Sequence, residues 1–287
     1  MIMNEYCKRC LLGKKLDDYP AWASAEAAAE YRRRVLALVN ENETLSSPEV
    51  DCEIDRIHES LFGPRLDYDP IKRRFNALML EREGDMLDGI AAAPDPLERA
   101  VQYAMTGNFI DFAALENVDE GALRGLLAKA GEIRVDPAAL EALRRAVMSA
   151  RSLLFMTDNC GEIVADKALI RTLSALNPAL EITAMVRGAP VVNDATVEDA
   201  VQVGLDRVAK VIGSGCGVAG NPLHRISDEA RRAIDAADVL IGKGQANYEA
   251  LNGCGLNMFY IFMCKCQLFM DRFHVPLYAG MLTQEDF

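Results

Sequence analysis

The chain has 287 residues, of which 51% are hydrophobic and 26% are charged. This length suits about two domains, and the composition excludes disordered and fibrous proteins. The 43 acidic residues outnumber the 31 Lys and Arg residues, which gives a formal net charge of −12. A field of this sign repels phosphate backbones and the sequence has no dense basic stripe, so we do not expect a nucleic-acid partner.

Residues 1–149 are predicted to be helical almost throughout. Residues 24–40 carry apolar side chains at the three-to-four-residue spacing of an amphipathic helix, and residues 71–83 and 97–105 repeat this pattern. Proline and glycine residues separate these segments. No strand-like alternation extends beyond a few residues, so we expect a helical N-terminal lobe.

Residues 150–287 are predicted to form an α/β lobe. Helical stretches here alternate with short apolar runs, which are residues 152–157, 180–186, 207–212, 239–241 and 258–263. Such alternation is typical of parallel strands joined by right-handed helical crossovers. We therefore expect an α/β fold in which the helical lobe packs on a doubly wound, mostly parallel, Rossmann-like α/β/α sheet lobe.

Polar residues follow the strands of this predicted sheet, where open α/β folds bind their ligands. Asp158 and Asn159 follow the first strand, and Asp194 follows the second. Two carboxylates and an amide oxygen make an all-oxygen site suited to Mg²⁺ or Mn²⁺. The sequence therefore predicts a divalent-metal site from these three residues.

Further residues at the same edge suit an anionic ligand. Arg187 offers a planar fork that matches phosphate, and Asn193 lies beside the second aspartate. Lys243 stands between two glycines and can reach into a crevice, and Gly161 opens a helix whose N-terminal N–H groups can bind an anion. Together with a metal ion, these groups suit phosphoryl chemistry.

Simpler interpretations exist for parts of this set. Asn159 and Glu162 fit a helix capping box, as Thr196 and Asp199 do more loosely. A single lysine such as Lys243 is usually solvated. These interpretations do not explain two aspartates after adjacent strands. A G-x-G-x-x-G match at residues 215–220 is interpreted as a loop, because Asn-Pro follows it where a nucleotide-binding helix should begin.

Several ordered blocks resemble the metal-dependent damage-control phosphatase family, also known as domain of unknown function 89 or the ARMT1-like domain. They are Asp158-Asn-Cys-Gly-Glu162, Arg187-Gly-x-Pro-x-x-Asn-Asp194 with Thr196, and Gly242-Lys-Gly-Gln-Ala-Asn-Tyr-Glu249. Gly107-Asn-x-Ile-Asp111 is similar to a further block. Cys7-x-x-Cys10 with Cys160 resembles the prokaryotic branch of the family.

The resemblance implies hydrolysis of small phosphomonoesters, such as sugar phosphates or damaged phosphometabolites. It implies a cofactor of Mn²⁺, Ni²⁺, Co²⁺ or Mg²⁺, held by Asp158, Asn159 and Asp194. It also places Lys243 against the phosphate, and Asn108 and Asp111 along the same cleft. The nucleophile is either a metal-activated water or the carboxylate of Asp158.

The cysteines leave alternatives open. Cys7 and Cys10 have the spacing of half a zinc site or of a redox pair, and Cys160 is a candidate third member. Buried thiols without such a role are the other interpretation. The N-terminus has no secretory leader, and the longest apolar run, residues 258–264, is too short to span a bilayer. We therefore expect a soluble, cytoplasmic protein that does not bind membranes.

Two other functions compete with a phosphatase. One is an S-adenosylmethionine-dependent carboxyl methyltransferase, which an acidic residue at the end of the second strand would favour, whereas this chain has Arg187 and Gly188 there. The other is a non-catalytic metal-binding module. The oligomeric state is left open.

Overall fold

The computed structural model describes residues 1–108 and 120–284, without the side chains of residues 120–123. Its first half is helical, as expected. Single-turn 3₁₀ helices lie at Ala130–Glu132 in this half and at Leu205–Arg207 in the second half. The helices of this half are α1 (Glu5–Lys15), α2 (Ala25–Glu41), α3 (Ser47–Phe62), α4 (Asp69–Leu80), α5 (Glu83–Ala91), α6 (Pro96–Gly107), α7 (Glu120–Ala128) and α8 (Pro137–Ser149).

The second half alternates strands and helices. Its strands are β1 (Ser152–Met156), β2 (Glu181–Val186), β3 (Lys210–Gly213), β4 (Val239–Lys243), β5 (Met258–Met263) and β6 (Gly280–Gln284). Its helices are α9 (Glu162–Leu176), α10 (Val197–Gln202), α11 (Asp228–Ala236), α12 (Gly244–Leu251) and α13 (Gln267–Phe273). The five apolar runs of the sequence each contribute a strand, and β6 is an addition that the sequence did not reveal.

The strands form one sheet in the order β3-β2-β1-β4-β5-β6. Neighbouring strands from β3 to β5 are parallel, and β6 pairs with β5 in the antiparallel direction. From β1 the chain builds the sheet outward through β2 to β3, and it then returns to place β4 on the other side of β1. The carboxyl ends of β1 and β4 therefore flank the switch point at which open α/β sheets bind ligands.

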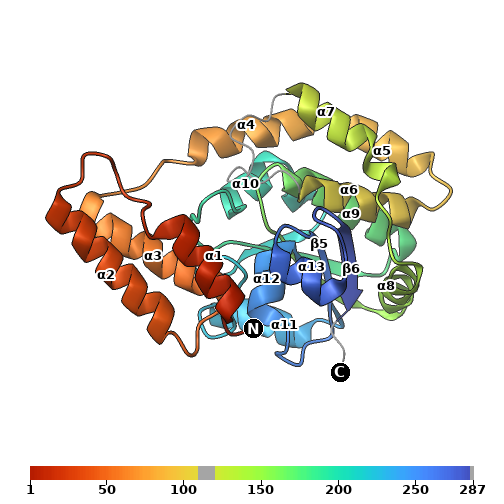
Figure 1. The fold of residues 1–287 in the computed structure, drawn as a ribbon. Coiled ribbons are helices and arrows are strands. Elements are labelled where there is room, and N and C mark those ends of the chain that lie inside the picture. The colour runs from red at the N-terminus through yellow and green to blue at the C-terminus, as the bar shows by residue number, and fades with distance from the viewer. Residues whose placement is uncertain (109–119, 285–287) are drawn as a thin grey trace.

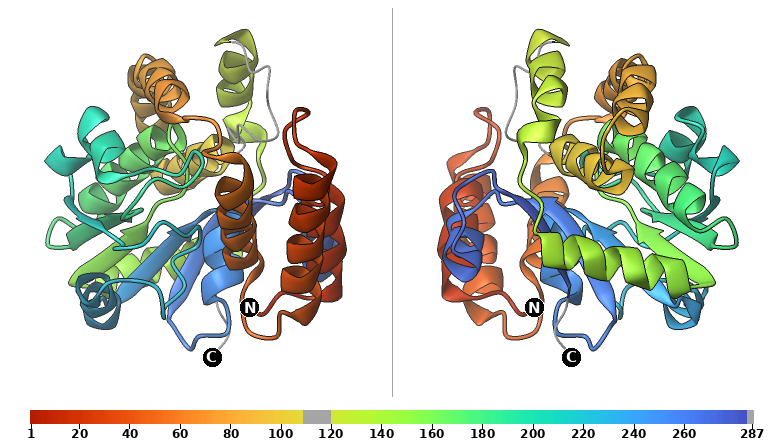
Figure 2. Two further views of the ribbon diagram at one scale, coloured as in Figure 1. Left: turned by 90° about the vertical axis from the view of Figure 1, so that its left-hand side faces the viewer. Right: turned by 90° about the vertical axis from the view of Figure 1, so that its right-hand side faces the viewer.

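Helices cover both faces of the sheet, which gives the expected α/β/α layers (Figure 2). Leu153 and Phe155 of β1 join a core cluster with α6, α8 and α9. Leu154 and Met156 point the other way and pack with α11, α12 and α13. Because successive strand side chains point to opposite faces, a continuous apolar run such as β1 fits a strand buried on both sides.

Helices α1 to α3 have a core of their own, built on residues such as Tyr31, Val35 and Ile54. They stand apart from the sheet in Figure 1. Helices α4 to α8 instead contribute to the core cluster that includes the sheet. The change from helices to strands occurs at the predicted boundary between residues 149 and 150, but helices on both sides of it share one core cluster. Within the described ranges, no helix has the length and apolarity needed to cross a membrane.

The two predicted capping boxes have different outcomes. Thr196 and Asp199 form one at the start of α10, as predicted. The box predicted for Asn159 and Glu162 is wrong, because α9 begins later, with Gly161 as its N-cap at φ 72°. The side chain of Asn159 is consequently available for other contacts.

Candidate active site at the ends of β1, β2 and β4

The loops that follow β1 and β2 are joined to each other. Asn159 and Asp194 form an isolated antiparallel bridge. The N–H of Ala195 donates to the carbonyl of Asp158 at 2.8 Å, and the N–H of Cys160 donates to the carbonyl of Asn193 at 2.9 Å. These main-chain bonds hold the predicted metal ligands Asp158, Asn159 and Asp194 at one edge of the sheet, with side chains that are nearly buried.

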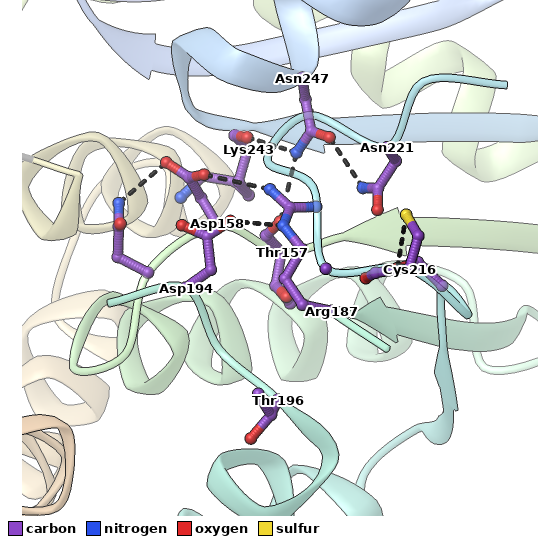
Figure 3. Close-up of polar contacts among 12 residues, drawn as sticks. Thr157, Asp158, Arg187, Asp194, Thr196, Cys216, Asn221, Lys243 and Asn247 are labelled. Atoms are coloured by element: carbon purple, nitrogen blue, oxygen red, sulfur yellow. Dashed lines mark hydrogen bonds and ion pairs between the residues drawn. The ribbon is translucent and has the colours of Figure 1, made fainter. Parts of the chain in front are cut away.

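Arg187 links the two aspartates. Its Nε donates to Asp194, and its Nη2 lies 3.4 Å from a carboxylate oxygen of Asp158. Figure 3 shows the guanidinium pointing at both carboxylates, with Thr196 farther away. Arg187 is only 1% exposed, so it balances buried acids in this structure and does not present an open fork to phosphate. A hollow of about 620 Å³ between α4 and α10 also borders Arg187, but Asp158 and Asn159 do not line it.

The carboxylate of Glu162 organises two asparagine side chains. Asn159 donates from Nδ2 to Glu162 at 2.9 Å and to Asp158 at 2.8 Å. Asn108 donates from Nδ2 to the same two carboxylates, and its Oδ1 accepts the N–H of Met263. Ionised carboxylates only accept hydrogen bonds, so both amides must turn their NH₂ groups toward them. The Oδ1 of Asn159 is thereby turned away from Glu162.

Lys243 lies beneath these residues. It is fully buried, and its ammonium donates to the carbonyl of Ala104 at 3.0 Å, to Glu162 at 2.5 Å and to Asp166 at 2.6 Å. An ammonium has three N–H donors, and these three contacts use all of them. The expected reach of Lys243 into an open crevice is therefore wrong for this structure, because the ion pairs with α9 keep its side chain inside.

The N–H of Gly161 was expected to bind an anion, but it already has a protein partner. It donates to Oδ1 of Asn76, on α4, at 2.6 Å. The Nδ2 of Asn76 in turn donates to Asp199 and to Gln202 of α10, each at 2.9 Å. Asn76, which was not predicted as a site residue from the sequence, thus joins the start of α9 to α10.

A cavity of about 430 Å³ opens onto the candidate metal ligands. Asp158, Asn159, Asn193 and Asp194 form one part of its lining. The Nδ2 of Asn193 is buried and has no hydrogen-bond partner among the described residues, which suits its predicted contact with a ligand. The other walls come from α1, α3, α12 and the segment after β5, through Cys7, Cys10, Lys14, Asp51, Cys52, Gln245, Glu249, Lys265 and Cys266, among others.

The charges at this edge of the sheet do not balance. Two buried cations face four buried carboxyl groups, which gives a formal excess of two negative charges among Arg187, Lys243, Asp158, Glu162, Asp166 and Asp194. Burial, then the neighbouring Asp194 and Glu162, raise the pKa of Asp158 well above its ordinary value. Buried charges in proteins are normally paired or bound to a metal ion, so a divalent cation fits this site in charge and in donor type.

A metal ion bound at this site would need an amide oxygen as a ligand in addition to the carboxylates. In the described part of the chain, no three His, Cys, Asp or Glu side chains come together as a metal site. Asp158 and Asp194 supply two carboxylates, and the third predicted ligand is the side-chain oxygen of Asn159. That oxygen is the atom left on the far side of the amide from Glu162.

The structure separates the predicted cysteine trio. Cys7 and Cys10 line the cavity together with Cys266, which long-range folding was expected to bring near them only if the chain formed a zinc site. Cys160 is fully buried and is not a lining residue of that cavity, and the charged groups that most affect its thiol are Asp199 and Lys72. A site shared by Cys7, Cys10 and Cys160 is therefore not formed. Asp111 lies outside the described residues.

Comparisons with known proteins agree on one family. The profile of the damage-control phosphatase ARMT1-like domain matches residues 3–280. A protein from Archaeoglobus fulgidus named a damage-control phosphatase is 26% identical over 93% of each chain. A damage-control phosphatase from Pyrococcus horikoshii is 34% identical over 66% of each chain, and an uncharacterised protein from Methanocaldococcus jannaschii is 30% identical over 76% of this chain and 73% of its own.

The fold has a solved counterpart. The crystal structure of a DUF89 family protein from Pyrococcus horikoshii superposes with a TM-score of 0.81 over the full length of both chains, at 24% sequence identity. This likeness confirms the α/β fold predicted from the sequence.

Proposed function

Because this chain belongs to the damage-control phosphatase ARMT1-like family, we propose that it hydrolyses small phosphomonoesters with a divalent metal ion bound by Asp158, Asn159 and Asp194. The observation that carries this proposal is the formal excess of two negative charges among the buried groups of this site, of which Asp158 and Asp194 line the cavity. Relatives named damage-control phosphatases support the reaction class. Sugar phosphates and damaged phosphometabolites are the proposed substrates.

The oxygen donors suit Mn²⁺ or Mg²⁺, and Ni²⁺ or Co²⁺ are the further candidates. When bound, the ion would polarise a phosphoryl oxygen and help to neutralise the charge of the transferred group. Asp158 and Asp194 enter the cavity from two loops that main-chain bonds tie together. Their spacing is therefore set by the fold and requires little rearrangement, which favours a preorganised site.

The chain's own groups would share the remaining work. Arg187 compensates the charge of both aspartates from inside the protein. Asn193 offers an unpaired amide N–H₂ beside Asp194, where it can donate to a phosphate oxygen. The cavity volume of about 430 Å³ accommodates a phosphorylated metabolite.

Two nucleophiles remain compatible with the geometry, a water molecule or the Asp158 carboxylate. Trapping of a covalent intermediate distinguishes them. If water attacks phosphorus directly, the protein is never phosphorylated and borohydride added during turnover leaves Asp158 unchanged. If Asp158 attacks, the alcohol leaves and an aspartyl-phosphate forms before water cleaves its P–O bond, so borohydride reduces Asp158 to homoserine, which mass spectrometry of the peptide detects.

The activity is tested on metal-stripped protein with p-nitrophenyl phosphate and then with a panel of sugar phosphates. We expect hydrolysis to require added metal, with Mn²⁺, Co²⁺, Ni²⁺ and Mg²⁺ compared at equal concentration. Hydrolysis that persists at full rate without metal, or no hydrolysis of any phosphomonoester, contradicts the proposal. Transfer of a methyl group from S-adenosylmethionine would support the methyltransferase alternative instead.

A further inference from the structure

We infer that Asp166 and Lys243 are positioning residues, which fix the metal ligands Asp158 and Asn159 through Glu162. This inference rests on the proposed metal site, although it concerns residues that do not reach the cavity. It also gives Lys243 a role other than the phosphate contact that the sequence blocks suggested.

Lys243, Glu162 and Asp166 form a buried ion-pair cluster. Glu162 and Asp166 lie one turn apart on α9, where two like charges repel each other. Lys243 enters between them from the end of β4 and binds each carboxylate with one N–H, at 2.5 Å and 2.6 Å. All three side chains are fully buried. Lys243 is the buried cation that faces both carboxylates, and its two ion pairs hold Glu162 in one position.

Glu162 also connects this cluster to residues that line the cavity. Its carboxylate accepts from Nδ2 of Asn159 at 2.9 Å and from Nδ2 of Asn108 at 3.0 Å. The same two amides also donate to one oxygen of Asp158, at 2.8 Å and 3.1 Å. Glu162 thus decides which way the Asn159 amide is turned. It also steadies the two donors that orient the Asp158 carboxylate.

Metal affinity distinguishes a positioning role of Asp166 and Lys243 from simple stabilisation of the fold. Partners behind metal ligands typically change metal affinity or activity about 10- to 100-fold when they are altered. An ion pair that only stabilises the fold would instead change the unfolding temperature and leave metal affinity alone. The matched control is Glu83, which pairs with Lys167 of the same helix at 2.8 Å but does not contact Glu162.

The test is calorimetric titration of metal-stripped protein with Mn²⁺. We expect Asp166→Asn, which keeps the side-chain shape, to weaken Mn²⁺ binding about tenfold or more. Glu83→Gln likewise removes one carboxylate charge that lies next to α9, and this variant should bind Mn²⁺ as the wild type does. If Asp166→Asn does not fold, the double variant Lys243→Met/Asp166→Leu removes one cation and one carboxylate together, so the net charge of the cluster stays the same, and it should show the same loss.

Wild-type Mn²⁺ affinity in a folded Asp166→Asn or double variant overturns the inference, as does a wild type that binds no Mn²⁺. An equal loss in Glu83→Gln also overturns it, because any charge removed near α9 would then suffice. Failure of the proposed function gives a different result. In that case the wild type binds Mn²⁺ and Asp166→Asn binds it more weakly, but neither protein hydrolyses a phosphomonoester.

Discussion

The side-chain oxygen of Asn76 accepts the main-chain N–H of Gly161 at 2.6 Å, which ties helix α4 to the turn that begins helix α9. The two residues are 85 positions apart in the sequence. Through this bond the helical first half of the chain supports the loop that carries the candidate metal ligands. The bond also uses the N–H that a phosphate was expected to occupy.

Removing this bond should destabilise the protein. Asn76→Ala leaves the buried N–H of Gly161 without a partner and takes one donor from the Asp199 carboxylate, which keeps its bonds to Lys72 and Thr196. An unpaired buried polar group costs about 1–3 kcal/mol. We expect a loss in the free energy of unfolding of that order, measured by urea denaturation. The exposed Asn40→Ala should change it by less than about 0.5 kcal/mol. An equal effect of the two substitutions would show that the bond contributes nothing.

Gly244 should be required for the site because of its close approach to Asp158. A Cβ at this position would lie within van der Waals overlap of the Asp158 carboxylate, and the residue has φ +77°. Gly244→Ala should therefore displace Asp158, and a displacement of about 1 Å can cost roughly 10²-fold in rate. The measurement is kcat/KM with p-nitrophenyl phosphate and saturating Mn²⁺.

The control for this change is Gly253→Ala. Gly253 has φ +86° with nothing within 4 Å of the added Cβ, so it shares the backbone strain but not the contact. We expect Gly253→Ala to lower the unfolding free energy by about 1–2 kcal/mol and to keep kcat/KM. Similar activity in the two alanine variants would contradict the role given to the Gly244 contact.

The stability of the protein should depend on pH through Glu249, on the cavity wall. Burial raises the pKa of Glu249 to about 7, from an ordinary value of 4.5. Because the folded state binds this proton more tightly, its contribution to stability is present at low pH. That contribution is lost as the pH rises from about 4.5 through about 7.

Glu249→Gln removes the cost of the buried charge. We expect the variant to match the wild type near pH 4 and to exceed its free energy of unfolding by about 1–3 kcal/mol near pH 8. Chemical denaturation at both pH values measures the difference. A variant that is less stable than the wild type at pH 8 would show that Glu249 is held charged by partners.

The cysteines should differ in their reactivity. Burial raises the pKa of Cys7 to about 11, and Cys160 is fully buried, whereas Cys10 is exposed. Because the thiolate is the reactive form, iodoacetamide at pH 7.5 should label Cys10 first, Cys7 slowly and Cys160 only after unfolding. Peptide mass spectrometry measures the order, with the exposed Cys254 as the positive control. Early labelling of Cys160 in the folded protein would contradict its placement.

The sequence predicted the sheet well because its central strands are buried on both faces. Residues 153–156 and 258–263 are continuously apolar, and each run lies in a strand. β6 was missed because Gly280–Gln284 has no such run, and its antiparallel pairing with β5 is a tertiary contact. The aspartates were found because parallel strands deliver the residues that follow them to one edge of the sheet.

The direction of individual side chains could not be predicted in the same way. Lys243 was expected in the cavity, but its partners Glu162 and Asp166 come from another part of the chain. A signal did exist for Asn76. It lies on the same helical stripe as Phe75 and Met79, and the buried face of α4 is built from these positions. A polar residue on an apolar stripe indicates a buried partner, although it does not say which one.

The central claim is that Asp158, Asn159 and Asp194 bind a metal ion that phosphate hydrolysis requires. It is tested most directly by kcat/KM for p-nitrophenyl phosphate, measured on metal-stripped and Mn²⁺-reconstituted protein, wild type and Asp194→Asn. We predict that the wild type is active only with Mn²⁺, and that folded Asp194→Asn is at least about a hundredfold less active with it. Wild-type turnover by Asp194→Asn, or turnover independent of Mn²⁺, would contradict the claim.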